Sequence, residues 1–99
     1  MPEDELLVQA GSRLKSGDLQ GARTAYEAVA DRGSLDGAFG LAQTYDPDFP
    51  ALRRIRGSKP DLRLARMWYE RAAKLGSLEA SERLKELKDK LSASDVLRR

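Results

Sequence analysis

The segment DLQGARTAYEAVADRGSLDGAFGL at residues 18–41 recurs 43 positions later as DLRLARMWYERAAKLGSLEASERL at residues 61–84. Eleven of the 24 paired positions are identical, including Asp18 and Asp61 at the start of each copy. A period of about 20–50 residues is typical of stacked helical units, each too small to bury its apolar face alone. The repeat therefore predicts an all-α fold in which copies of one helical unit pack side by side.

Apolar residues three and four positions apart, punctuated by helix-start and helix-stop residues, predict five helices. Asp18 and Ser34 suit the starts of helices, and Gly33 suits a helix end because glycine readily adopts the left-handed conformation. Segment 46–60 (DPDFPALRRIRGSKP) holds three prolines and no sustained period, so we expect one long loop there. The expected helices span about 4–15, 18–32, 35–45, 61–75 and 77–91, and residues 92–99 are expected to form a loose tail.

Composition indicates one globular domain over residues 1–99, with 40% hydrophobic and 34% charged residues. No apolar run approaches the roughly 20 residues needed to cross a bilayer. The chain as given is therefore expected in the cytoplasm, or in the periplasm if it is a fragment of a longer exported protein. The net charge of +2 conceals an asymmetry, because residues 1–50 carry −5 and residues 51–99 carry +7. Such polarity favours an acidic partner or head-to-tail self-association.

The sequence offers little of the chemistry that catalysis uses. It has no histidine and no cysteine, so the commonest general base, the thiolate nucleophile and the nitrogen and sulfur metal ligands are all missing. Asp46-Pro47-Asp48 lacks the pattern of a calcium-binding loop, and we interpret both aspartates as turn residues. We therefore expect a protein that is not an enzyme, with no catalytic, cofactor-binding or metal-binding residues.

The second helix of each unit carries a recognisable motif. It reads AR-x-x-YE-x-x-A-x-x-G from Ala22 and AR-x-WYE-x-AA-x-x-G from Ala65. These motifs resemble the Sel-one-like repeat, a relative of the tetratricopeptide repeat, and the resemblance covers residues 6–91. It implies a right-handed α-solenoid of about five antiparallel helices, or about two and a half units. It also implies an adaptor or scaffold in protein complexes, commonly bacterial, with no catalytic residues.

Two departures from the family pattern are evident. Segment 46–60 inserts extra residues, rich in Arg and Pro, where the family has a shorter turn. In the last unit Lys85 and Lys88 replace the expected Gly and Tyr, as in a degenerate terminal repeat.

The resemblance also implies that the first helix of each pair lines a concave, partner-binding surface. Phe39 lies off the apolar stripe of its helix, so it either meets a partner or packs under the 46–60 loop. Trp68 replaces Ala25 of the first copy and either fills the core or anchors a partner. The candidate partner-binding residues are Gln9, Arg13, Asp36, Phe39, Gln43 and Arg83 on the groove, Arg53, Arg54 and Arg56 on the loop, and Trp68.

The expected function is thus a protein-interaction scaffold that binds a peptide or protein through its helical groove and its basic loop. One alternative is a polyanion or nucleic acid held by the basic loop, although only Phe49 and Trp68 could stack on bases and no glycine-rich phosphate loop is present. Another is a structural module that assembles with copies of itself into a homo-oligomer.

Overall fold

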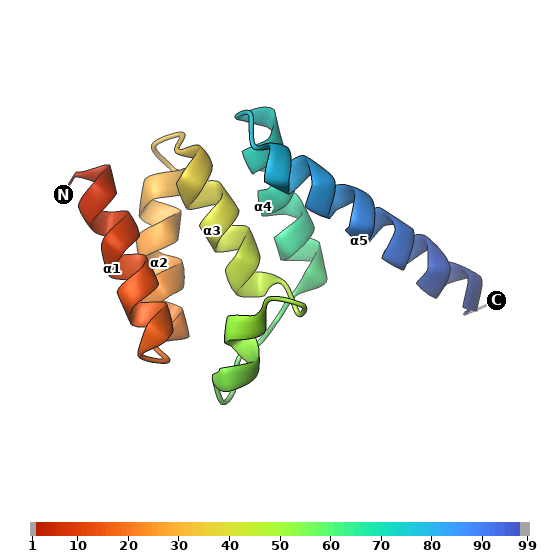
Figure 1. Cartoon of the computed structure of the whole chain (residues 1–99), viewed down its shortest axis with the longest axis horizontal. Helices are drawn as coiled ribbons and strands as arrows, with labels where there is room; N and C mark the ends of the chain where they lie inside the picture. The colour runs from red at the N-terminus through yellow and green to blue at the C-terminus, as the bar shows by residue number, and fades with distance from the viewer. Residues whose placement is uncertain (1, 98–99) are drawn as a thin grey trace.

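The computed structural model describes residues 2–97, and side chains as far as residue 89. Over this range the chain is all-helical, with no strand, as the repeat predicted (Figure 1). A short 3-10 helix, η1, interrupts the connection between the third and fourth α-helices. The elements are α1 (Glu3–Lys15), α2 (Leu19–Ala30), α3 (Leu35–Tyr45), η1 (Pro50–Arg54), α4 (Leu62–Lys74) and α5 (Leu78–Leu97).

Identical residues of the two copies stop and start the helices in the same way. The Asp18 carboxylate accepts a hydrogen bond from the Gly21 backbone N–H at the start of α2, and Asp61 does the same for Arg63 and Leu64 in α4. Ser34 and Ser77 cap α3 and α5 through their hydroxyl oxygens. The glycine before each serine has positive φ, at 86° for Gly33 and 110° for Gly76, a conformation that other residues adopt only with strain.

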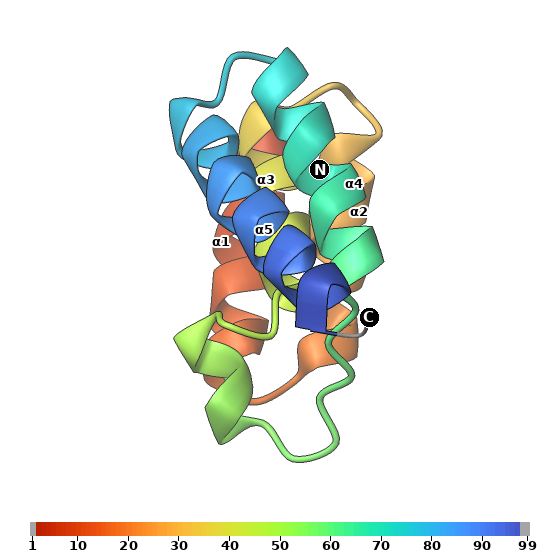
Figure 2. The same ribbon diagram turned by 90° about the vertical axis from the view of Figure 1, so that its right-hand side faces the viewer.

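The five helices form two layers. Figure 2 shows α1, α3 and α5 on one side and α2 and α4 on the other, and the closest backbone contacts join helices that follow one another in the chain. The core lies between the layers and is filled by alanines together with a few large side chains such as Leu41, Tyr69 and Leu87. Small residues let the helices approach closely, and the larger ones fill the remaining volume.

The 46–60 segment is ordered by contacts at its two ends. The Asp61 N–H donates to the Tyr45 carbonyl at 2.8 Å, which closes the loop at its base. Arg23 of α2 lies inside this closure: its guanidinium donates to the backbone carbonyls of Thr44 at 2.6 Å and Lys59 at 3.0 Å. The segment is therefore a closed loop with η1 inside it, rather than the irregular connection that its prolines suggested.

The end of the chain differs from the expectation. The sequence predicts a loose tail from residue 92, but α5 continues to Leu97 and its second half extends beyond the other helices (Figure 1). The reason is local, because no glycine or proline follows Ser77 to stop the helix. Residues 98 and 99 of the expected tail lie outside the described part of the chain. None of the helices in that part is long and apolar enough to span a membrane.

Two glycines provide a matched test of this packing. A Cβ at Gly37 would lie 2.6 Å from the Ala30 backbone nitrogen, whereas a Cβ at Gly11 would meet nothing within 4 Å. We expect Gly37→Ala to lower the free energy of unfolding by about 1–3 kcal/mol because α3 must move away from α2. Gly11→Ala should raise it by roughly 0.5–1 kcal/mol, because alanine loses less backbone entropy in a helix. Urea unfolding followed by circular dichroism measures both, and equal effects would contradict the close α2–α3 contact.

Candidate functional site

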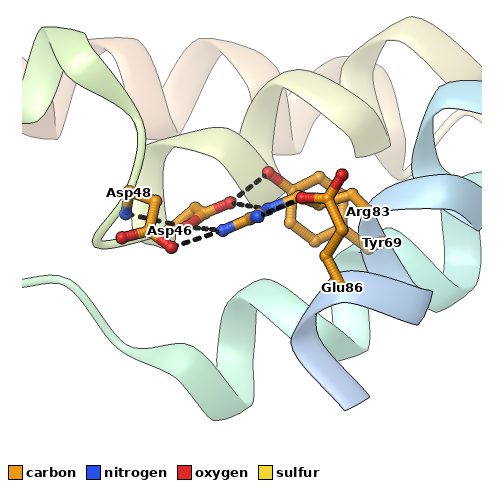
Figure 3. Close-up of polar contacts among 5 residues, drawn as sticks. All are labelled: Asp46, Asp48, Tyr69, Arg83 and Glu86. Carbon is orange, nitrogen blue, oxygen red and sulfur yellow. Dashed lines mark hydrogen bonds and ion pairs between the residues drawn. The ribbon is translucent and has the colours of Figure 1, made fainter. Parts of the chain in front are cut away.

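A buried carboxylate joins three helices at one side of the molecule (Figure 3). Asp46 follows the last residue of α3 and is 2% exposed. Arg83 of α5 donates to both of its oxygens, from Nε at 2.8 Å and from Nη2 at 3.0 Å. The hydroxyl of Tyr69, from α4, donates to the same carboxylate at 2.7 Å. A paired charge of this kind is expensive to break, because the partner left behind is poorly solvated.

Arg83 is held by two further carboxylates. Its Nη2 donates to Asp48 at 2.9 Å and its Nη1 donates to Glu86 at 2.6 Å. Four of the five N–H donors of the guanidinium are thereby engaged. Gly40 occupies the corresponding position of the first copy, where the ring of Tyr26 would lie only 2.4 Å from an added Cβ. The arginine is thus specific to the second unit.

The charges of this network are fixed near neutral pH. Burial acts to raise the pKa of Asp46, but hydrogen bonds from Arg83, Tyr69 and the Asp48 backbone outweigh it and hold that pKa below its ordinary value. Burial and the neighbouring Asp46 raise the pKa of Tyr69. The Asp46 carboxylate raises the pKa of Arg83. None of the three groups titrates near pH 7, so the arrangement acts as an electrostatic clamp between the three helices at neutral pH.

The clamp forms part of the wall of a groove between α3 and α5. The groove has a volume of about 320 Å³. The rings of Phe39 and Tyr69 pack with their centroids 5.7 Å apart, and Phe49 and Pro50 line the groove from the loop. Acidic side chains outnumber the single arginine among the residues that line it. They are Asp46, Asp48, Glu79, Glu82 and Glu86.

The structure brings together three of the residues that the sequence proposed for partner binding. Phe39, Gln43 and Arg83 all line this groove. Phe39 is half-buried, packed against the core through the Tyr69 ring and also lining the groove, and its role in binding a partner stays a prediction. Arg83 is not a free ligand, because carboxylates of this chain engage most of its donors.

The other proposed residues lie elsewhere. Trp68 agrees with the first of its two expected roles, because it is only 9% exposed and packs in the core, with the Arg71 guanidinium 5.5 Å from its ring. Arg13 pairs with Asp18 at 2.9 Å at the α1–α2 turn. Asp36 is exposed in the first turn of α3, and Gln9 is half-buried on α1.

The basic loop contributes to a different cleft. Arg53, Arg54 and Arg56 are all exposed. Arg54 lines a cleft of about 740 Å³ between the end of α1 and η1, which shares no residue with the groove. Among the residues that the structure describes, no group of three or more acidic, histidine or cysteine side chains could hold a metal ion.

Sequence reasoning missed the central residues of the clamp. Asp46 was interpreted as a turn residue, and Tyr69 entered only as part of the repeated motif. The available signal was the replacement of Gly40 by Arg83 at equivalent positions of the repeat, since a partly buried arginine needs hydrogen-bond partners. Arg23 was also missed. Its counterpart in the second copy, Arg66, is exposed and pairs with Glu70 within its own helix.

Replacing Asp46 by asparagine tests the clamp. We expect the free energy of unfolding at pH 7 to fall by about 2–3 kcal/mol, because Arg83 loses its buried carboxylate partner. The folded-state pKa of Asp46 lies below the ordinary value of 3.8. The difference in free energy of unfolding between the wild type and Asp46→Asn should therefore be largest above about pH 5 and should disappear as the pH falls through the folded-state pKa. Urea unfolding at several pH values measures this difference.

Two further variants control for this test. Asp36→Asn removes an exposed aspartate from the same helix and should change stability by less than about 0.5 kcal/mol. Tyr69→Phe keeps the ring and removes one hydrogen bond, so it should cost about 1 kcal/mol. A difference between wild type and Asp46→Asn that stays constant down to roughly pH 2 would contradict the assignment.

Comparison with known proteins adds no further evidence on this site. The chain matches no family model, no curated protein and no solved structure. The repeat and the geometry of the chain's own residues are therefore the basis for its proposed function.

Proposed function

We propose that this chain is a non-enzymatic protein-interaction module that binds a peptide segment of a partner in the groove between α3 and α5. The observation that carries the proposal is the groove itself, which combines aromatic walls with an excess of carboxylates. Phe39 and Phe49 offer apolar surface, and the Gln43 amide offers a donor and an acceptor for a peptide backbone. A groove of this kind favours an apolar side chain flanked by Lys or Arg.

The same proposal includes the architecture. We infer a right-handed α-solenoid of antiparallel helix pairs, similar to Sel-one-like repeats. The 43-residue repeat, the equivalent caps of both copies and the two helical layers support this inference. In such an array the first helices of successive pairs lie next to each other and form an extended surface. The groove lies between α3 and α5, the first helices of two successive pairs.

The fixed charges of the clamp support a binding role rather than a catalytic one. Arg83 holds Asp48 and Glu86 in place beside the groove, so their positions are set before a ligand arrives. Preorganised groups lose less entropy on binding than mobile ones. A cationic peptide would meet carboxylates that are already oriented.

Selection from a random peptide library displayed on phage tests this function. We expect the wild type to enrich peptides that carry Lys or Arg next to an aromatic or aliphatic residue. Glu82→Lys, which reverses one exposed charge of the groove, should weaken synthetic versions of these peptides about tenfold, because like charges across an interface are strongly unfavourable. Isothermal titration calorimetry measures the affinities.

A matched control makes the result specific. Glu27→Lys changes the charge equally on α2, in the other layer, and should leave the affinities unchanged. Peptides that bind both variants as well as the wild type would place the site outside the groove. Tight binding of a single-stranded oligonucleotide that is lost in Arg54→Glu and at high salt would instead favour the polyanion alternative.

A further inference from the structure

The outer face of α1 carries an unusual stripe. Asp4, Val8, Gly11 and Lys15 follow one another at spacings of four, three and four residues, which places them on one side of the helix. Ala10, on the opposite side, is completely buried. Val8 is 72% exposed, and a Cβ at Gly11 would meet nothing within 4 Å. The stripe is therefore an open face with an apolar residue and a gap at its centre.

This stripe is complementary to itself when the direction of the helix is reversed. Asp4 and Lys15 lie equally far from its centre, and so do Val8 and Gly11. A second α1 running antiparallel would place Asp4 opposite Lys15 of its partner, and Val8 opposite Gly11. Both contacts would occur twice, once on each side of a two-fold axis.

The residues around α1 add to this complementarity between two antiparallel copies of the helix. Its first half forms a shallow patch of Asp4, Glu5, Val8 and Gln9. Its second half borders the cleft of about 740 Å³, whose lining is mostly apolar and whose charged members are both basic. The cleft residues are Gly11, Leu14, Lys15, Ser16, Gly17, Ala51, Arg54 and Ile55. An acidic patch with an exposed valine thus lies on the first half of α1, and its second half borders a basic, mostly apolar cleft that η1 completes.

We propose that the occupant of this cleft is a second copy of the chain, bound through α1 about a two-fold axis. Val8 of each copy enters the cleft of the other next to Gly11, and Asp4 and Glu5 approach Lys15 and Arg54. The interface closes on itself, so assembly stops at the dimer. It shares no residue with the α3–α5 groove, which each copy keeps open for a peptide. Because one helix and a short loop form it, the association is concentration-dependent rather than obligate.

Sedimentation equilibrium of the purified chain over a range of protein concentrations tests the dimer. The average mass should rise from that of the monomer toward twice that value, and the dissociation constant should increase with salt, because exposed ion pairs are screened. A mass that stays monomeric up to roughly 1 mM protein at low salt would overturn the proposal.

Gly11→Gln separates association from folding. An added Cβ meets no atom of its own monomer within 4 Å, and glutamine is a better helix former than glycine, so the melting temperature should rise. The same side chain fills the gap that Val8 of the partner requires, so the dissociation constant should increase about tenfold or more. Dimerisation that is as tight as in the wild type would place the interface elsewhere.

Charge reversal tests the pairing across the axis. Asp4→Lys and Lys15→Asp should each weaken the dimer roughly tenfold, because the two-fold axis applies every change twice. The double variant should recover most of the wild-type affinity, since it restores opposite charges in each pair. Asp36→Lys, a reversal in the first turn of α3, is the matched control and should not affect association. Failure of the double variant to recover while it remains folded would overturn the antiparallel arrangement.

Discussion

The Asp46 carboxylate is the interaction on which the functional part of this structure depends. It lies at the end of α3, almost without exposure to solvent, and receives hydrogen bonds from Tyr69 of α4 and Arg83 of α5. A buried charge is tolerated only when its partners are correctly placed, so the network restricts the positions of all three helices. The backbone contacts of α5 are chiefly with α4. The ion pair joins α5 to the end of α3 in the wall of the groove between them.

The 46–60 loop is also held in place by buried hydrogen bonds and ion pairs. Its first residue is held by the clamp, and Arg23 holds Lys59 near its other end. The buried side chain of Leu52 fixes the middle of the segment. Between these anchors the loop contributes Phe49 to the groove and Arg54 to the cleft beside α1. An insertion that interrupts the repeat therefore supplies walls for two separate surfaces, one facing α5 and the other facing α1.

The charge asymmetry along the sequence does not correspond to the charge of the individual surfaces in the folded chain. The second half of the chain is basic overall, yet its Glu79, Glu82 and Glu86 line the groove. The first half is acidic overall, yet Lys15 faces the cleft together with Arg54. Net charge summed along the chain thus does not identify which surface attracts which partner. Local surface charge does so, because exposed charges act over about 10 Å or less at physiological ionic strength.

The sequence by itself determined the all-helical class, the five helices and most of their ends, because periodic apolar residues, Asp and Ser caps and Gly stops act within a few residues of one another. It also placed Phe39, Gln43 and Arg83 on one surface, but together with Gln9, Arg13 and Asp36, which do not line the groove. It could not determine that Arg83 is paired with Asp46, 37 positions away, or that Trp68 is buried. Those outcomes required the tertiary structure, since burial and ion pairing depend on how the long loop folds between the helices. Sequence patterns that span a few residues carry no information on such contacts between distant residues.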